Sequence, residues 1–173
     1  MNLPLLLALL LLISCSPAVK KEQRPAVVTD PYHDISDSIL HVALDPALQE
    51  RKNDTSYYAA TSFAGDTIGF YVRYIGRIAA SSQKASMALV QVRAYFASTF
   101  CPHANNQLWF IVDNKRYGRY VGMDFLKFAM KGDSLVFTST EKEGRTSAVA
   151  VSFRDSIPSL LLVNGDLYSF DKE

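Results

Sequence analysis

The chain has 173 residues, of which 18 are Lys or Arg and 17 are Asp or Glu, so its formal net charge is +1. This balance gives no bulk electrostatic attraction to nucleic acid, and we expect no nucleic-acid partner. Hydrophobic residues make up 49% of the chain and aromatic residues 12%, which is enough apolar material for one packed core.

The N-terminal residues are apolar, with a run from Leu3 to Ile13 that is broken only by Pro4. At about 1.5 Å per helical residue, this run is too short to cross the ~30 Å hydrocarbon core of a membrane. A short apolar run followed by small residues is typical of a secretory signal peptide. We therefore expect residues 1–14 to be a signal peptide that is removed from the mature protein.

The run ends in Leu12-Ile13-Ser14-Cys15. This junction resembles the lipobox of bacterial lipoproteins, in which a signal peptidase cuts before a cysteine that carries diacylglycerol. The resemblance implies that Cys15 is the lipid attachment site and that its acyl chains hold the protein on a membrane. Ser16, directly after the cysteine, resembles the lipoproteins that are sorted to the outer membrane. The expected location is therefore the bacterial cell envelope, on the outer membrane.

The chain holds two cysteines, and the lipid would use one of them. Cys101 is then left without an intramolecular partner in an oxidising compartment. We therefore expect no disulfide to stabilise the fold.

Residues 16–30 read SPAVKKEQRPAVVTD, with two prolines, a mixed-charge run and no apolar period. Such a segment is typical of a flexible spacer. We assign residues 15–34 to a flexible tether and residues 35–173 to a single β-rich domain.

At the start of this domain, Leu40, Val42 and Leu44 alternate with polar or small residues, which predicts a strand over 38–44. Asp45 and Pro46 follow, and they are typical of an N-cap and a first helical position. The pattern predicts a short helical turn from there through residue 51.

Further along the chain, short segments of alternating apolar and polar residues are separated by turn residues. The predicted strands are 57–63, 67–75, 87–97, 107–112, 117–121, 125–130, 134–140, 145–153, 160–163 and 166–170. A helix over 84–97 is an alternative, although clean alternation and paired valines favour a strand there. The fold class predicted is all-β: an antiparallel β-sandwich or barrel, with a short helical turn near the N-terminus.

A candidate ligand or partner face comes from Tyr71 and Arg73 on one predicted strand and Arg93 and Tyr95 on the next. Residues two apart on a strand share a face, so each pair points to one side. If the strands are neighbours, one outward face carries Tyr and Arg side by side. Such a face suits flat sugars or anionic groups, and it also suits protein partners. Ordinary cross-strand packing on a solvated face produces the same pattern.

Arg and Tyr recur together at 116–117 and at 119–120 as well. Trp109 lies within an apolar run, and we expect it in the core rather than in a ligand site.

Asp30, Asp34, Asp37 and His41 would share one face of a helix, and carboxylates with imidazoles are the ligand types of a metal site. The strand predicted over 38–44 separates these residues, so a solvated segment is the favoured interpretation. We expect no metal and no other cofactor.

Two patterns suggest an enzyme. Cys101 and His103 could form a nucleophile pair, but no local signature accompanies them. Ser81-Ser82-Gln83-Lys84 matches the Ser-x-x-Lys motif of penicillin-recognising enzymes, but it lies between predicted strands and lacks the companion motifs. The sequence therefore disfavours an enzyme.

The function predicted is that of a membrane-anchored cell-envelope lipoprotein whose β-sandwich binds another envelope protein or a glycan. Two alternatives remain open at this point: a small envelope hydrolase that uses Cys101 and His103, and a structural subunit of an envelope assembly.

Overall fold

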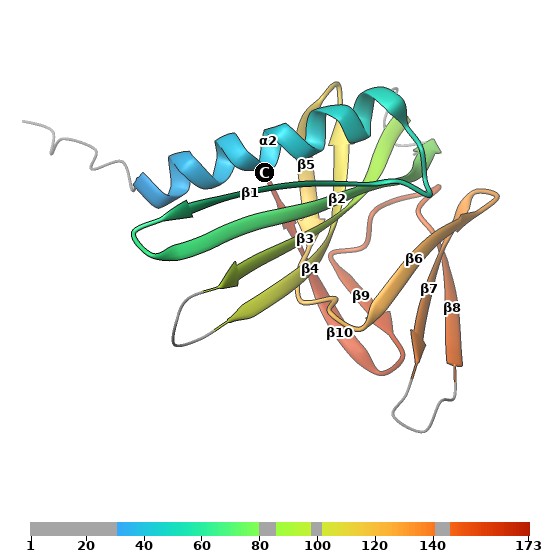
Figure 1. Cartoon of the computed structure of the whole chain (residues 1–173). Coiled ribbons are helices and arrows are strands. Elements are labelled where there is room, and N and C mark those ends of the chain that lie inside the picture. Colours follow the sequence, from blue (N-terminus) through green and yellow to red (C-terminus); the bar gives the residue numbers. More distant parts are fainter. Residues whose placement is uncertain (1–30, 80–85, 98–101, 141–145) are drawn as a thin grey trace, which may run out of the picture.

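The computed structural model describes residues 31–79, 86–97, 102–140 and 146–173. In these ranges one helix, α2 (Pro31–Glu50), precedes ten strands that form two antiparallel sheets (Figure 1). The larger sheet has the strand order β1-β2-β3-β4-β5-β10-β9, and the smaller has the order β6-β7-β8. The predicted all-β, sandwich-like fold is therefore confirmed.

The strand bounds follow the predicted alternation closely. The strands are β1 (Ser56–Phe63), β2 (Asp66–Ala79), β3 (Ser86–Ala97), β4 (His103–Val112), β5 (Lys115–Tyr120), β6 (Leu126–Lys131), β7 (Ser134–Thr140), β8 (Thr146–Ser152), β9 (Leu160–Val163) and β10 (Asp166–Lys172). The alternative helix over 84–97 is wrong, because β3 occupies its described residues, 86–97. Three hairpins turn through two residues of positive φ, as type I′ turns require: Ala64-Gly65, Asp113-Asn114 and Asn164-Gly165.

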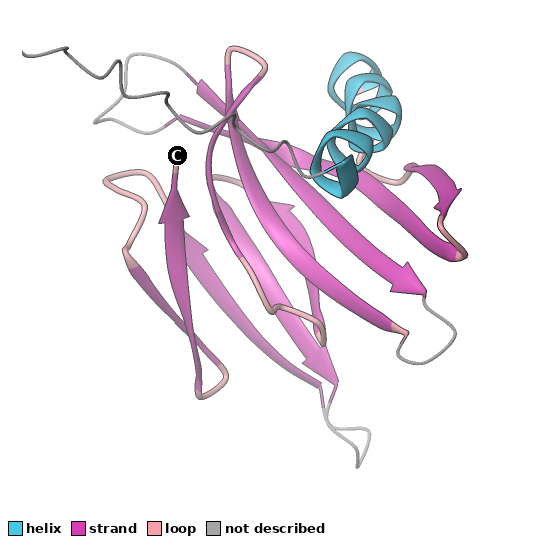
Figure 2. Ribbon diagram, turned by 90° about the vertical axis from the view of Figure 1, so that its left-hand side faces the viewer, coloured by secondary structure: helices cyan, strands magenta, loops and turns pink. Residues whose placement is uncertain are grey.

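The helix α2 covers one side of the larger sheet (Figure 2). Its buried side chains are small or aliphatic and recur at helical spacing: Leu40, Ala43, Leu44 and Ala47. They pack in one cluster with residues of β2, β3 and β4 that include Val72, Val90 and Trp109. The alanines bring the helix close to the strands.

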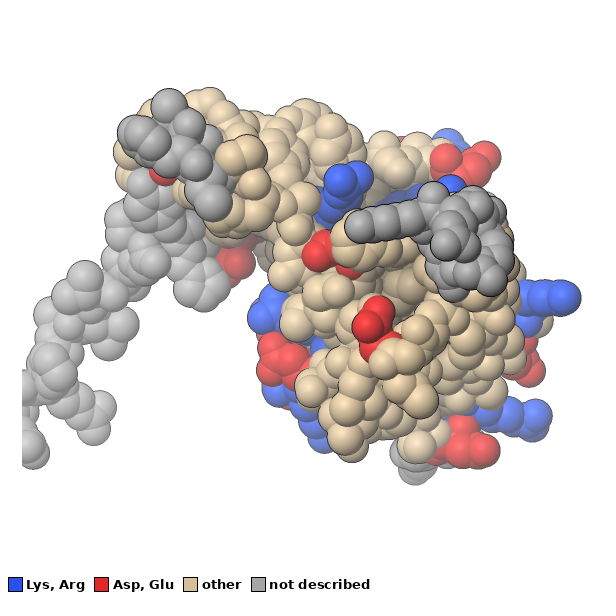
Figure 3. Space-filling view, turned by 90° about the horizontal axis from the view of Figure 1, so that it is seen from below, with Lys and Arg blue, Asp and Glu red and all other residues tan. Residues whose placement is uncertain are grey.

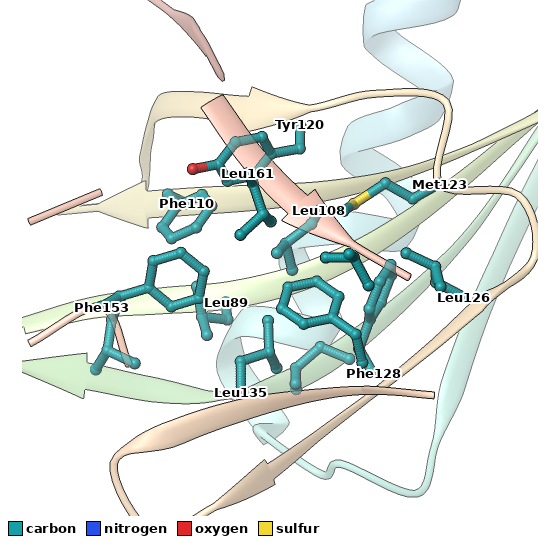
Figure 4. Close-up of a cluster of buried hydrophobic side chains, with 14 of the residues drawn as sticks. Leu89, Leu108, Phe110, Tyr120, Met123, Leu126, Phe128, Leu135, Phe153 and Leu161 are labelled. Carbon is teal, nitrogen blue, oxygen red and sulfur yellow. The ribbon is translucent and has the colours of Figure 1, made fainter. Parts of the chain in front are cut away.

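The other side of the larger sheet packs against the smaller sheet and forms the second core (Figure 4). Leu89 and Phe110 of the larger sheet meet Phe128, Leu135 and Phe153 there, and all of these side chains are almost fully buried. This core lies over only one half of β2 and β3. The first half of β2 and the last half of β3, which pair with each other, are not covered by the smaller sheet. Tyr71 is exposed there.

The strand predicted over 38–44 is wrong, since α2 runs through it without a break. Leu40 and Leu44 fit both a strand and a helix, but Ala43 and Ala47 complete a buried stripe that only a helix makes. Val42, which a strand would bury, is 64% exposed.

The predicted helix start at residues 45 and 46 is also wrong, because Pro46 lies inside α2. The helix begins at Pro31 and so includes the last four residues of the predicted tether. Among the described residues, no helix is long and apolar enough to span a membrane.

Candidate functional site

The uncovered half of the larger sheet brings the four predicted face residues together. In the β2–β3 register, Tyr71 lies opposite Arg93, Arg73 opposite Gln91 and Gly69 opposite Tyr95. A pocket of about 640 Å³ is formed here. Its lining consists of Tyr71, Arg73, Arg93 and Tyr95 together with Ser56, Gln91 and Ala104.

A third tyrosine, Tyr58 of β1, joins Tyr71 and Tyr95 on this side of the sheet. The ring centroids of Tyr58 and Tyr71 are 4.6 Å apart and those of Tyr58 and Tyr95 are 6.1 Å apart, both pairs being stacked. Tyr58 is 51% exposed and Tyr71 46% exposed. Tyr58 is not among the residues predicted for this face. The hairpin turn at 64–65 nevertheless implies it, because counting away from the turn along both strands sets Tyr58 opposite Tyr71.

Glycine at position 69 allows Tyr95 to lie across the neighbouring strand. A Cβ atom built on Gly69 would be 2.3 Å from Cε1 of Tyr95, so no other residue leaves room for the ring. The Tyr95 hydroxyl forms a hydrogen bond with the hydroxyl of Tyr58. This bond, followed by burial and by the neighbouring tyrosines, raises the pKa of Tyr95 to about 12. The phenol is therefore neutral at physiological pH.

Arg73 is held by its own protein. Its Nε and Nη2 atoms donate to Oε1 of Gln91 at 3.1 and 2.9 Å, and Nη2 also donates to the backbone oxygen of Phe128 at 3.0 Å. Nη1 donates to the backbone oxygen of Asn53 at 3.4 Å. Burial lowers the pKa of Arg73, although a guanidinium stays charged. Arg73 therefore joins β6 to the floor of the pocket.

The hydrogen bonds continue from Gln91 to Asn106, at the edge of the part of the larger sheet that the smaller sheet covers. Nε2 of Gln91 donates to Oδ1 of Asn106 at 2.9 Å. Nδ2 of Asn106 donates to the backbone oxygens of Met123 and Leu126, at 2.8 and 3.2 Å. Asn106 is only 4% exposed, and no periodic pattern in the sequence singles it out.

Arg93 is the contrasting case. Its side chain is exposed, and within the described part of the chain it has no hydrogen bond or ion pair. None of the described residues that line the pocket is acidic. Seen from below, the molecule is mostly uncharged, with charged side chains of both signs scattered over it (Figure 3). The charged side chains among the described lining residues are Arg73 and Arg93, and both are positive.

A second hollow, of about 760 Å³, lies on the helix side of the sheet, where no site was predicted. Its arginines have partners: Arg116 pairs with Glu173 and stacks over Trp109, and Arg119 lies 3.2 Å from the carboxylate of Asp171. Trp109 is buried, as expected of a core residue.

The predicted nucleophile pair is described only in part. His103 lies exposed on β4, and its ring stacks on Phe96 with centroids 5.7 Å apart. Cys101 lies outside the described residues, as do Cys15 and the Ser-x-x-Lys segment at 81–84.

The acidic segment near the helix start does not assemble a metal centre among the residues that the structure describes. His41 is exposed, and its Nδ1 lies 3.4 Å from Oδ1 of Asp45, one turn along α2. Asp30 and the side chain of Asp34 lie outside the described residues, so the proposed grouping with Asp37 and His41 is not described.

Comparisons with known proteins complete these observations. The chain matches no protein family model, and neither the curated proteins nor the solved structures gave a match. The residues of the pocket are therefore the basis for a functional conclusion.

Proposed function

We propose that this protein is a cell-envelope lipoprotein, anchored through Cys15 to the outer membrane, whose domain binds a carbohydrate between Tyr71 and Arg93. The observation that carries the proposal is the pocket of about 640 Å³ in which the exposed Tyr71 and the half-buried Tyr95 stand beside Arg93, whose guanidinium has no partner among the described residues. The anchor is supported by the resemblance of residues 12–15 to a lipobox.

The dimensions and the lining favour a sugar over a protein partner. Small-molecule sites are concave and enclose about 300–1,000 Å³, whereas a stable protein interface takes about 800 Å² from each partner. Tyrosine offers a ring face for the apolar side of a sugar ring, and the guanidinium of Arg93 offers donors to its oxygens. Ser56 adds a hydroxyl to the same lining.

Two polar side chains in the floor of the pocket are already ordered. Arg73 and Gln91 are fixed by hydrogen bonds to each other before any ligand arrives. A site whose side chains are already ordered loses less entropy on binding.

The anchor is tested by replacing Cys15 with alanine in cells fed with labelled fatty acid. We expect the wild-type protein to take up the label and to enter the detergent phase, and the Cys15→Ala variant to do neither. A labelled variant in the detergent phase would show that the lipid is attached elsewhere or that Cys15 is irrelevant.

Carbohydrate binding is tested with the mature protein, purified in detergent, on an array of neutral and acidic oligosaccharides. Loss of a tyrosine platform removes about 1 kcal/mol, so Tyr71→Ala should bind the retained sugars about fivefold more weakly. Phe125→Ala is the matched control, because Phe125 is 88% exposed and does not line the pocket. The proposal fails if the wild-type protein retains no sugar, or if the two variants bind equally well.

A further inference from the structure

We propose that the ligand is an acidic sugar and that its carboxylate pairs with Arg93. This inference rests on the proposed function, since it names the class of carbohydrate that the same pocket takes.

The two arginines of the pocket have different roles. Arg73 directs Nε, Nη1 and Nη2 to oxygens of its own protein, at 2.9 to 3.4 Å. Arg93, whose guanidinium carries five N–H donors, directs none of them to another described residue. The anion-binding capacity of the pocket therefore belongs to Arg93, and Arg73 is a positioning residue.

The charge of the pocket favours an anionic group. Among the described lining residues there is no carboxylate, and the oxygens that bind Arg73 are neutral, so the charges of both arginines remain. Arg93 has no partner among the described residues, and the two oxygens of a carboxylate fit the fork of its guanidinium in a bidentate pair.

The position of Arg93 places the rest of the ligand over the tyrosines. Arg93 is directly opposite Tyr71, and side chains at such positions have Cβ atoms about 4.5–5.5 Å apart. Tyr95 lies two residues beyond Arg93 on the same side of β3. A carboxylate held at Arg93 therefore carries its sugar ring to the exposed ring of Tyr71. This arrangement distinguishes a sugar acid from a bare anion, which would make no use of the aromatic rings.

The test compares acidic sugars with matched neutral ones by calorimetry on the mature protein in detergent. The probes are sialyllactose with lactose, and trigalacturonic acid with its methyl ester. A charge-assisted bond in a partly exposed site is expected to make the bound acid at least about tenfold tighter than its neutral partner. Added salt should reduce that preference.

Variants assign the preference to one guanidinium. Arg93→Gln should bind the acid and its neutral partner equally, and Arg93→Lys, which keeps the charge without the fork, should retain part of the preference. Arg77→Gln is the matched control, because Arg77 is an exposed arginine of β2 that does not line the pocket.

Each outcome decides between the two proposals. Equal binding of acid and neutral sugar by the wild-type protein, or an acid preference that survives Arg93→Gln, overturns the role of Arg93 and leaves carbohydrate binding intact. Competition by inorganic phosphate at the same concentration as the sugar acid would identify a general anion site instead. If no probe and no arrayed sugar binds, carbohydrate binding itself is refuted.

Discussion

Replacing Asn106 by alanine tests whether the buried hydrogen bonds hold the two sheets together beside the pocket. The side chain of Asn106 makes three such bonds: to the backbone oxygens of Met123 and Leu126 at 2.8 and 3.2 Å, and from Nε2 of Gln91 at 2.9 Å. The first two join β4 to the segment that enters β6. The substitution removes all three bonds at once and leaves their partners at a buried position.

The expected cost follows from this count. A hydrogen bond contributes about 1 kcal/mol net to stability, so the loss of three lowers the free energy of unfolding by about 3 kcal/mol. A domain of this size has a total stability of about 5–15 kcal/mol, so the variant should still fold. With a urea dependence of about 1–3 kcal/mol per molar, the unfolding midpoint should fall by about 1–3 M.

The assay is urea unfolding of wild type, Asn106→Ala and Asn105→Ala, followed by circular dichroism. Asn105 is the neighbouring, exposed asparagine, whose Oδ1 accepts one bond from the backbone N–H of Gly122 at 3.2 Å. Asn105→Ala should cost less than about 1 kcal/mol. Equal unfolding midpoints for the two variants would refute the reasoning. They would show that the burial of Asn106 and the number of its hydrogen bonds do not set the loss of stability.

Three further predictions concern the helix and the tyrosines. Leu44 is buried and Val42 is exposed, so in urea unfolding Leu44→Ala should lower the free energy of unfolding by about 2–5 kcal/mol and Val42→Ala by less than about 0.5 kcal/mol. Equal losses would contradict the helix. Gly69→Ala should displace the Tyr95 ring and reduce the tyrosine signal in near-ultraviolet circular dichroism, and an unchanged spectrum would contradict the close contact. Because its pKa is raised from 10.0 to about 12, Tyr95 contributes stability that is complete below pH 10 and is lost as the pH rises towards 12. Tyr58→Phe should make that alkaline loss smaller in unfolding measured at stepped pH, and an identical loss would exclude the hydroxyl pair as its cause.

The strands were predictable because each has one buried side, so apolar and polar residues alternate along its sequence. In β3, for example, Val90 and Val92 face the helix and Gln91 and Arg93 face away. The helix was not predictable from the same rule. Two of its buried residues are alanines, which do not stand out as apolar positions in the sequence. Leu40 and Leu44 fit the spacing of a strand as well as that of a helix.

The candidate site shows a similar division. Alternation predicted that Tyr71 and Arg73 share a side of one strand and that Arg93 and Tyr95 share a side of the next. The pairing of β2 with β3 then brings all four into one pocket. The sequence could not show that Arg73 is hydrogen-bonded within the domain. Its partner on β6, the backbone oxygen of Phe128, is remote in sequence and belongs to the other sheet. Asn106 was missed for the same reason, since its partners become neighbours only when β6 folds over the sheet.

The small buried surface of α2 has a consequence for motion. The helix meets the sheet through the buried Leu40, Ala43, Leu44 and Ala47 and the partly buried Ile39 and Leu48, so among the described side chains it has fewer fully buried ones than β3 or β4, although it is longer than either. Pro46 also lacks the N–H that would bind the carbonyl of Val42. Elements with few buried contacts open before the rest of a domain. Amide hydrogens of α2 should therefore exchange with solvent faster than those of β3 and β4, and any pull transmitted along the chain from the N-terminus reaches this helix first.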